Sequence, residues 1–432
     1  MLADGKDAAV INITVVDKQG REVPDANNLV AFSIVGDAKI IGVGNGDPSS
    51  HELDKIFDGT WQRHLFNGKC QVIIQAGKTP GAIKFEAKSD GLYTGSTDIF
   101  TIPPSTSQIA GSKNASATKK NTVPAGRQVG RVLGADISFL PQLEERGMKF
   151  NDKGIQKDAI QILKDHGFNY IRLRIFNDPA ADSGYAPKKG FCDLEHTKQM
   201  AKRIKAAGLK LLLDFHYSDT WADPGKQFKP SAWKGLSFSV VKDSMYAFTK
   251  KVITELKAQG TTPDMVQIGN EINHGMIWPD GHVSHLDSLA QLIKAGTDAV
   301  LQVDPSIIML LHIALGGQND ESVFFLNNML SRGVYFDVIG ESYYPKWHGT
   351  LDDLGNNLTD LATRYSKDII VVEYSQLKKE VNDIAFNLPN DKGKGTMIWE
   401  PLNTWEKIFD EKGNSNDLIL AYDEISKKFL IK

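Results

Sequence analysis

The sequence predicts a (β/α)8 barrel preceded by a small antiparallel β-sandwich. Three observations lead to this fold class. Short runs of alternating apolar and polar residues fill residues 1–102, a stretch rich in Pro, Ser, Thr and Lys follows at 103–128, and residues 129–432 alternate apolar runs with amphipathic helical patterns. Alternation with period two is typical of antiparallel strands, whereas strands that alternate with helices form a parallel sheet.

The first segment, residues 1–102, contains four clear period-two runs and no convincing helical stretch. The runs are AVINITVVD, LVAFSIVG, CQVIIQAG and AIKFEAKS, and turn signals such as DKQG and GNGDP separate them. Short strands punctuated by such turns indicate a β-sandwich. Residues 103–128 hold too few large apolar side chains to offset the entropy of ordering, so we interpret them as a linker.

Residues 129–432 carry the barrel pattern. Helical sequences such as IQKDAIQILKDHG and LEHTKQMAKRIKAAG separate most of the apolar runs, and several end in glycine, a usual helix stop. A doubly wound open sheet is the alternative, but a glycine-rich first βα turn, which would favour it, is not present. The eight expected strands are residues 131–139, 169–176, 210–218, 265–273, 307–315, 337–345, 368–375 and 395–403.

Composition excludes several classes of partner. The 432 residues include 50 basic and 53 acidic side chains, for a net charge of −3. This balance argues against nucleic acid or an anionic membrane as the partner, because both require a basic face. No apolar run approaches the roughly 20 residues that a transmembrane helix needs. Two distant cysteines do not form a disulfide framework, and no signal peptide is visible at the start.

The active site of such a barrel lies at the C-terminal ends of its strands. Glu271 ends the fourth expected strand and Glu373 ends the seventh, each after an apolar run, so both carboxylates are expected at the rim. Glycoside hydrolysis needs such a pair, with one carboxyl protonated and the other ionised. The alternative is that each glutamate forms a structural ion pair with a nearby arginine. The early residues of these strands are apolar, as a barrel interior requires.

Aromatic and polar side chains at the same rim favour a carbohydrate substrate. Six of the 7 tryptophans follow strand ends, where flat rings suit stacking on sugar faces, although each one could instead simply cap the barrel. His216, beside Asp214 and Asp219, is interpreted as a hydrogen-bonding residue rather than a metal ligand, because no further ligands can be named. The sequence contains no HExxH, paired-cysteine or GxSxG motif, so we predict neither a metal site nor a serine hydrolase.

Four long motifs resemble the endo-β-1,4-galactanases of glycoside hydrolase family 53. They are GADISFLPQLEERG (134–147), LLLDFHYSDTWADPGKQ (211–227), GNEINHGMIWPDG (269–281) and SYYPKWHGTLDDL (342–354). The resemblance extends from residue 131 to about 405. It implies a retaining enzyme that cuts internal β-1,4 bonds of the galactan in pectin side chains, with Glu271 as acid/base and Glu373 as nucleophile.

The resemblance also implies roles for other rim residues. Asn270 would hold the 2-hydroxyl of the sugar, and Tyr343, with Tyr344 as the second choice, would hydrogen-bond the nucleophile. Arg174 and Tyr343 are expected to favour the ionised form of Glu373, whose charge would keep Glu271 protonated. Together with the rim aromatics, the expected substrate-binding residues are Asp136, Arg174, His216, Asp219, Trp221, Asn270, Trp278, Tyr343, Trp347 and Trp399.

Three further expectations follow. Some family members bind calcium in their last loops, but no ligand cluster is evident here, so no cofactor is expected. Because the implied substrate is a long plant polysaccharide, we expect an extracellular or cell-surface location, and we expect a monomer. Paired glutamates and rim tryptophans do not by themselves fix the sugar, so a related endo-glycanase acting on mannan or glucan, or a non-catalytic polysaccharide-binding barrel, remain as alternatives.

Residues 1–102 resemble the immunoglobulin-like domain of some family 2 β-galactosidases. The resemblance rests on VVDKQGREVPDANNLVAFSIVG and GVGNGDPSSHE. It implies no catalytic residues, so a spacer or packing role is the first interpretation and a sugar-binding role the second. Trp61 and Tyr93 are the aromatic candidates for contact with sugar in this segment.

Overall fold

The computed structural model describes residues 1, 3, 5–19, 21–56, 59–101, 127 and 129–431. The chain divides into two compact units, Met1–Lys119 and Lys120–Lys432. This division falls inside the predicted linker, residues 103–128, which lies outside the described residues except for Arg127. Arg127 forms an ion pair with Asp337 at 3.0 Å, so this one residue of the predicted linker packs on the second unit.

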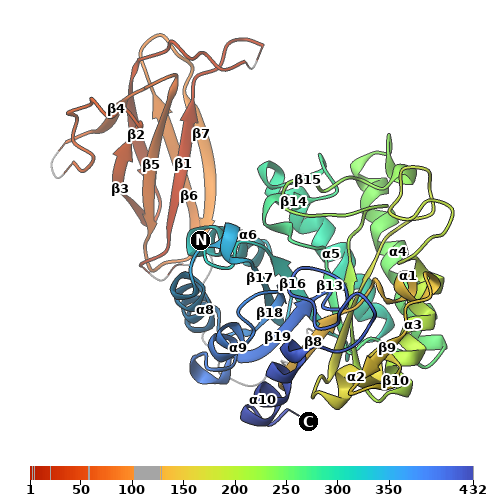
Figure 1. The fold of residues 1–432 in the computed structure, drawn as a ribbon. Coiled ribbons are helices and arrows are strands. Elements are labelled where there is room, and N and C mark those ends of the chain that lie inside the picture. Colours follow the sequence, from red (N-terminus) through yellow and green to blue (C-terminus); the bar gives the residue numbers. More distant parts are fainter. Residues whose placement is uncertain are drawn as a thin grey trace, which may run out of the picture. The chain divides into compact units, whose positions relative to one another are not determined.

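The first unit is the predicted antiparallel β-sandwich (Figure 1). One sheet has the strand order β1-β5-β3 and the other β4-β2-β6-β7. Both sheets contribute to one hydrophobic core, for example through Val72 of β5 and Phe85 of β6. The strands are β1 (Ala8–Thr14), β2 (Leu29–Val35), β3 (Ala38–Gly44), β4 (Trp61–His64), β5 (Lys69–Ala76), β6 (Gly81–Lys88) and β7 (Gly95–Thr101).

The two aromatic candidates of this unit differ in exposure. Trp61 packs against the sandwich core, whereas the side chain of Tyr93 is 99% exposed. Only Tyr93 therefore presents a free ring to solvent among these two.

The second unit contains a closed barrel of eight parallel strands, as the sequence predicts. The order around the barrel is β8-β11-β12-β13-β16-β17-β18-β19, and β19 pairs back onto β8. Seven of the predicted runs each contain one of these strands, and the eighth, 395–403, overlaps β19, which begins two residues earlier. The strands are β8 (Val132–Asp136), β11 (Tyr170–Ile175), β12 (Lys210–Phe215), β13 (Met265–Ile268), β16 (Ile308–Ile313), β17 (Val338–Tyr343), β18 (Asp368–Tyr374) and β19 (Gly393–Trp399).

Helices follow the barrel strands and cover them from outside (Figure 1). Short elements decorate the loops: β9 (Phe150–Asp152) pairs with β10 (Ile155–Lys157), and β14 (Gly275–Met276) with β15 (Gly281–His282). The helices are α1 (Leu140–Glu145), α2 (Ala159–Asp165), α3 (Leu194–Ala206), α4 (Phe238–Ala258), α5 (Leu286–Val303), α6 (Asn319–Ser331), α7 (Pro345–His348), α8 (Leu351–Tyr365), α9 (Lys378–Phe386) and α10 (Leu420–Lys428).

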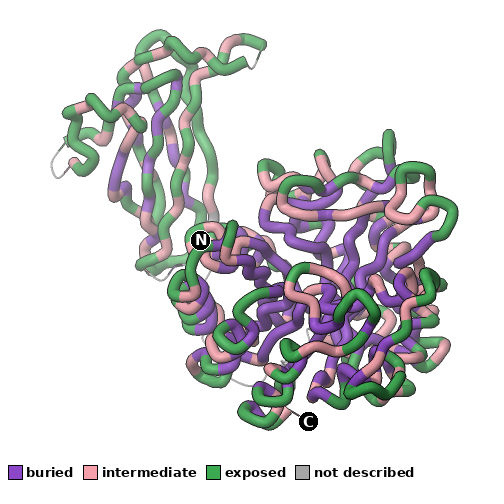
Figure 2. The backbone as a smooth tube through the Cα atoms, viewed as in Figure 1, coloured by how far each residue is buried: buried purple, intermediate pink, exposed green. Residues whose placement is uncertain are grey.

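The barrel strands are buried on both faces, as Figure 2 shows. Inward-facing apolar side chains such as Tyr170, Leu212, Leu310 and Val338 fill the barrel interior. Outward-facing residues pack against the helices in a second, larger core. Parallel strands covered on both faces read as continuous apolar runs, which explains the sequence pattern.

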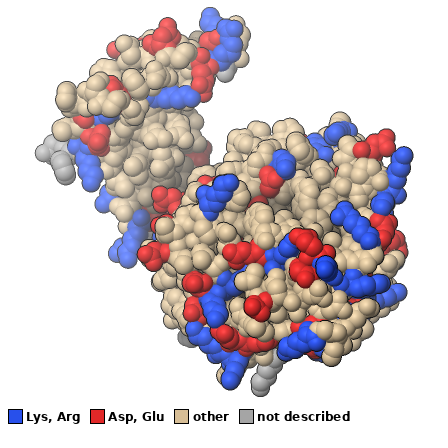
Figure 3. All heavy atoms as spheres, in the orientation of Figure 1, with Lys and Arg blue, Asp and Glu red and all other residues tan. Residues whose placement is uncertain are grey.

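Charged residues of both signs intermingle on the face drawn in Figure 3. This agrees with the net charge of −3. Within the part of the chain that the structure describes, no helix is both long and apolar enough to cross a bilayer.

Glu341 is a fully buried carboxyl outside the barrel interior. It lies on β17 and faces α6 and α8, where the Ser322 hydroxyl donates to Oε1 at 3.0 Å and the Asn357 amide donates at 3.4 Å. The other oxygen, Oε2, has no hydrogen-bond partner among the described residues. Burial raises the pKa of Glu341 well above its usual range, and the two hydrogen bonds lower it by less. The folded protein therefore holds this carboxyl in its neutral form.

Glu341→Gln is expected to stabilise the barrel increasingly as pH rises. A carboxyl whose pKa is raised by folding contributes its full stability below the pKa of the unfolded chain, about 4.3, and loses it as pH rises toward the folded value. Glutamine matches the neutral form and lacks this loss. We expect the Tm advantage to grow by about 3 °C or more between pH 5 and pH 8, followed by tryptophan fluorescence. An advantage independent of pH would contradict the neutral carboxyl.

Candidate active site

The C-terminal ends of the barrel strands meet around a cavity of about 250 Å³. Both predicted catalytic carboxylates, Glu271 and Glu373, line it, although they lie 102 positions apart in the chain (373 − 271). Eight of the twelve predicted site residues are among its walls. The lining residues are Asp136, Arg172, Arg174, His216, Trp221, Ala222, Asp223, Lys226, Asn270, Glu271, Glu373 and Trp399.

Arg172 is the buried centre of the site. It is 1% exposed and lies on β11, two residues before Arg174 and on the same face of the strand. One nitrogen, Nη1, donates to Glu373 at 3.1 Å and to Asp136 at 3.2 Å. The other nitrogens donate to three acceptors on β12, on β13 and just after β13, namely Asp214 at 2.8 Å, Asn270 at 2.9 Å and Gln267 at 3.2 Å.

Glu373 is held in a hydrogen-bonded position at the end of β18. Its Oε2 accepts from Arg172, and its Oε1 accepts from the hydroxyl of Tyr344 at 2.8 Å. Burial and the charges of Asp136 and Asp214 raise the pKa of Glu373 above its usual value, and the positive charge of Arg172 and the Tyr344 hydroxyl offset only part of that increase. Arg172 and Tyr344 thus favour the ionised form of Glu373 and fix the direction of its oxygens.

Glu271 has the opposite environment. Burial and the neighbouring charge of Glu373 raise its pKa to about 8, and the Ser342 hydroxyl and the charge of Arg172 offset only part of that increase. Its backbone adopts the left-handed conformation (φ 49°, ψ 54°) at the end of β13, a conformation that costs a non-glycine residue roughly 1–3 kcal/mol. The surrounding loop imposes this turn, for example through Gln227, whose amide donates to the carbonyl of Asn270 at 2.8 Å. Glu271 is therefore a strained, protonated carboxyl that faces an ionised one.

The structure corrects two predicted contacts with Glu373. The hydroxyl of Tyr343 donates to the carbonyl of Gly349 at 3.1 Å, and Tyr344 is the residue that reaches Glu373. Side chains alternate along β17, so Tyr343 faces the outer core and Tyr344 the barrel mouth. Likewise, Arg172 pairs with Glu373, whereas Arg174 pairs with Glu400 and with Asp136 at 3.5 Å.

Tyr344→Phe is expected to lower kcat by about 10- to 100-fold, because it removes a hydrogen bond to a charged carboxylate. The control is Tyr343→Phe, which deletes the same hydroxyl from the adjacent residue. That control is expected to leave kcat within about twofold, since the lost bond is to a backbone carbonyl away from Glu373. Initial rates of polysaccharide hydrolysis measure both. The reverse order of effects would contradict the assignment of Tyr344.

His216 has a partner at each ring nitrogen. Its Nδ1 accepts from the backbone N–H of Ala222 at 3.1 Å, and its Nε2 lies 3.1 Å from Asp214. This agrees with the hydrogen-bonding role expected from the sequence, in which the ring orients a carboxylate that in turn holds Arg172. Among the residues that the structure describes, no group of three or more His, Cys, Asp or Glu side chains is arranged to hold a metal ion.

The tryptophans form a continuous aromatic wall beside the cavity. Trp399 lies 6.3 Å from Trp221 and 5.5 Å from Trp405, measured between ring centroids, and Trp405 lies 6.1 Å from Trp347. Trp347 and Trp405 are each 54% exposed and border a second cavity of about 350 Å³ that also contacts Tyr344. Rings with exposed faces next to paired carboxylates are suited to holding a chain of sugar residues.

Two other predicted site residues do not line the catalytic cavity. Asp219 accepts from the backbone N–H groups of Asp178 and Ser231, at 3.1 Å and 2.7 Å, and so organises loops behind the cavity. Trp278 donates through its indole N–H to the carbonyl of His274 at 3.1 Å. Both follow strand ends, but their side chains form internal contacts of the loops.

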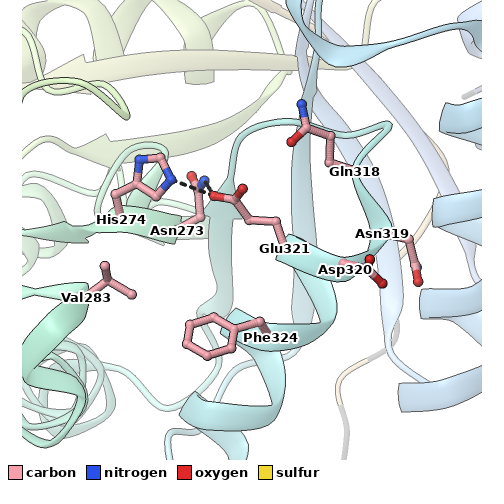
Figure 4. A pocket seen from close by; sticks show the side chains of 8 residues that line it. All are labelled: Asn273, His274, Val283, Gln318, Asn319, Asp320, Glu321 and Phe324. Atoms are coloured by element: carbon pink, nitrogen blue, oxygen red, sulfur yellow. Dashed lines mark hydrogen bonds and ion pairs between the residues drawn. The ribbon is translucent and has the colours of Figure 1, made fainter. Parts of the chain in front are cut away.

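A larger, polar cavity of about 750 Å³ opens on the side of β13 and β16 (Figure 4). His274 and Glu321 face each other across it in an ion pair at 2.6 Å, and Asn273 donates to the same carboxylate at 2.6 Å. Phe324 presents a half-exposed ring to the cavity. Neither catalytic carboxylate lines it, so the chemistry belongs to the smaller cavity.

The sequence analysis assigns no role to Arg172 and ranks Tyr344 below Tyr343. The alternation of side chains along each strand indicates where both residues point. Residues two apart on a strand share a face, so Tyr170, inside the barrel, predicts that Arg172 also points inside. Val338 of β17 likewise predicts that Tyr344, six positions later and just after the strand, points inside.

Comparison with known proteins agrees with this geometry. The profile of "Glycosyl hydrolase family 53" matches residues 132–400, and that of "Glycoside hydrolase family 2 C-terminal domain 5" matches residues 1–98. A solved structure, the Ignisphaera aggregans GH53 catalytic domain, aligns with a TM-score of 0.64 and 34% identity over 70% of this chain and 98% of that one.

Two curated relatives are similar over the barrel. An "Uncharacterized protein in bgaB 5'region" of Niallia circulans is 47% identical over 251 residues, which is 56% of this chain and 66% of that protein. An endo-β-1,4-galactanase of Bacillus subtilis (strain 168) is 36% identical over 245 residues, 56% of each chain. The matched segment thus spans about half to two thirds of these relatives. The family match covers more than half of the chain, and this protein belongs to glycosyl hydrolase family 53.

Proposed function

We propose that this protein is an endo-acting, retaining β-1,4-galactanase that cleaves internal bonds of the galactan in pectin side chains. The observation that carries the proposal is the contrast between two carboxyls in one cavity. Glu271 is buried without an ion pair and its pKa is raised to about 8, whereas Glu373 is held by Arg172 and Tyr344. A protonated and an ionised carboxyl at one site are the requirement of glycoside hydrolysis.

In the first step Glu373 attacks the anomeric carbon as Glu271 gives its proton to the leaving glycosidic oxygen. The C–O bond to the leaving sugar breaks and a galactosyl ester of Glu373 forms. The charge of Glu373 is then consumed, so the pKa of Glu271 falls and its carboxylate can take a proton from water. The water oxygen attacks the anomeric carbon from the opposite face to Glu373, which leaves as a carboxylate, and Glu271 is again protonated.

The substrate class rests on the aromatic wall and on the relatives. The wall from Trp221 through Trp399 and Trp405 to Trp347 supplies ring faces for several consecutive sugars, as an endo-acting enzyme needs. Relatives named as endo-β-1,4-galactanases favour galactan over mannan or glucan. Because such a polymer does not enter cells, we propose that the protein acts outside the cell or at its surface.

A time course of products tests this proposal. Linear β-1,4-galactan is expected to give a spread of oligosaccharides at early times, whereas mannan and cellulose are expected to remain intact. Proton NMR of the first products is expected to show the β-anomer before mutarotation. Cleavage of mannan or glucan in preference to galactan would favour the alternative, a related endo-glycanase acting on those polymers. An initial α-anomer would contradict the double displacement.

A further inference from the structure

Ser342 and His312 form a buried hydrogen-bonded pair next to Glu271. Both face the barrel interior, Ser342 from β17 and His312 from β16, and both are 0% exposed. The Ser342 hydroxyl lies 2.7 Å from Nε2 of His312, and it is also the hydrogen-bond partner of the Glu271 carboxyl. The proposed reaction uses neither residue.

The amide of Gln267 determines how the His312 ring is protonated. Its Oε1 accepts from Arg172 at 3.2 Å, and its Nε2 donates to Asp214 at 2.6 Å, so the orientation of the amide is fixed. The second hydrogen on Nε2 has three acceptors within reach, and we assign it to the nearest, Nδ1 of His312 at 2.9 Å, rather than to Oδ1 of Asn270 or the carbonyl of Gly269, each at 3.2 Å. Nδ1 is therefore an acceptor.

The remaining bonds follow from this assignment. Burial lowers the pKa of His312 well below its usual value, so the ring is neutral and has one N–H. With Nδ1 as the acceptor, Nε2–H donates to the oxygen of Ser342, and the hydroxyl hydrogen of Ser342 is left to point at Glu271. In the reverse chain Nδ1–H donates to the second lone pair of Oδ1 of Asn270, 2.9 Å away, and Nε2 accepts from Ser342, so the two chains predict opposite effects of Ser342 on the pKa of Glu271.

We propose that Ser342 is a positioning residue for the acid/base Glu271, held by His312 so that its hydroxyl donates to the Glu271 carboxylate. The proposal rests on the proposed retaining mechanism. A hydrogen bond from a hydroxyl is stronger to an ionised carboxylate than to a neutral carboxyl. Ser342 thus supports the form of Glu271 that must activate water in the second step, and it fixes the direction of a side chain whose backbone is strained.

Other titratable and charged groups face Glu271 and His312, and all of them remain in every variant below. The groups that face Glu271 are Glu373, Asp223 and Arg172, with Tyr344 on the far side of Glu373. The groups that face His312 are Arg172, Asp214, His216 and His348.

The first test is the pH dependence of kcat/KM on linear galactan, whose alkaline limb reports Glu271 in the free enzyme. Ser342→Ala is expected to move this limb upward by about one pH unit, because a hydrogen bond to a charged group contributes a factor of ten or more. Ser322→Ala is the matched control, since it removes a buried serine hydroxyl from a different glutamate, Glu341. The control is expected to leave the limb in place.

The second test isolates the step in which Glu271 is the base. With 2,4-dinitrophenyl β-galactobioside, whose leaving group needs no acid, hydrolysis of the galactosyl ester limits the rate. Ser342→Ala is expected to lower kcat and KM together by about tenfold. Azide, a nucleophile that needs no base, is expected to restore turnover. If Ser342→Ala only disturbed the packing of the site, kcat/KM would fall and azide would not restore turnover.

His312 variants complete the test and replace Ser342→Ala if that variant does not fold. His312→Gln keeps an N–H donor near Ser342 and is expected to retain the wild-type alkaline limb, whereas His312→Leu is expected to shift it as Ser342→Ala does. An unchanged limb in both Ser342→Ala and His312→Leu would overturn the proposal, as would a shift to lower pH, which the reverse chain would produce. Failure of the wild type to cleave galactan would overturn the proposed function instead.

Discussion

Glu373→Ala is expected to reduce kcat on linear galactan by at least about 10⁴-fold, because the variant has no group to form the covalent intermediate. Glu373→Gln, which keeps the size of the side chain, is expected to lose as much. In both variants Arg172 still pairs with Asp136 and Asp214, so the buried charge stays compensated and the fold should persist. Release of reducing ends, with circular dichroism to confirm folding, measures the effect.

Azide tests the role of Glu373 independently of the rate. In the space left by the Glu373→Ala substitution, azide can attack the anomeric carbon of 2,4-dinitrophenyl β-galactobioside directly. A single displacement inverts the centre, so the product is expected to be the α-galactosyl azide. Activity of Glu373→Ala on galactan within a factor of ten of the wild type would show that another group is the nucleophile.

Glu271→Ala is expected to reduce kcat on galactan by about 10²–10⁴-fold, the usual contribution of general acid–base catalysis. The loss should depend on the leaving group. With a dinitrophenyl leaving group the first step needs no proton, so the galactosyl ester of Glu373 accumulates and kcat and KM fall together. Azide is expected to restore turnover and, since it attacks that ester, to give the β-galactosyl azide.

The opposite configurations of the two azide products separate the two carboxylates. If both variants gave the same anomer, or if Glu271→Ala gave no response to azide, the assignment of acid/base and nucleophile would be wrong. Glu271→Gln is the control for packing, because it keeps the volume of the side chain and cannot donate an acidic proton.

The alkaline limb of the wild-type pH profile also follows from Glu271. Burial and the charge of Glu373 raise the pKa of Glu271 to about 8, so the proton that the leaving group needs is retained up to that pH and lost above it. Activity on galactan is therefore expected to decline above about pH 8. In Glu271→Ala, assayed with the dinitrophenyl substrate, this limb is expected to disappear.

Sequence patterns are sufficient to predict the barrel because its strands are covered on both faces. Each predicted apolar run contains or overlaps one strand of the closed barrel, and the connection after the seventh strand forms α9. The same patterns place Glu271 and Glu373 at strand ends, since a strand that is buried along its length can expose a carboxylate only where it emerges. Both residues line one cavity.

Contacts within the site were predicted less well than its location. Tyr343 and Arg174 were expected beside Glu373, but Tyr344 and Arg172 occupy those positions. The reason is geometric: adjacent residues of a strand point to opposite faces, and neighbouring residues on one face lie about 6–7 Å apart along the strand. A motif resemblance locates the segment, whereas the register of the strands decides which side chain reaches a given atom.

The sequence by itself determined the two domains, the order of the elements and the two acidic residues that we propose carry the chemistry, because each depends on the local alternation of apolar and polar residues. Only the tertiary structure decided which neighbours set the form of each acid. That form depends on burial and on charges brought together from separate strands, such as Arg172 beside Glu373 and the His312–Ser342 pair beside Glu271. A pKa is set by all neighbours in space, and neighbours in space are a property of the closed barrel.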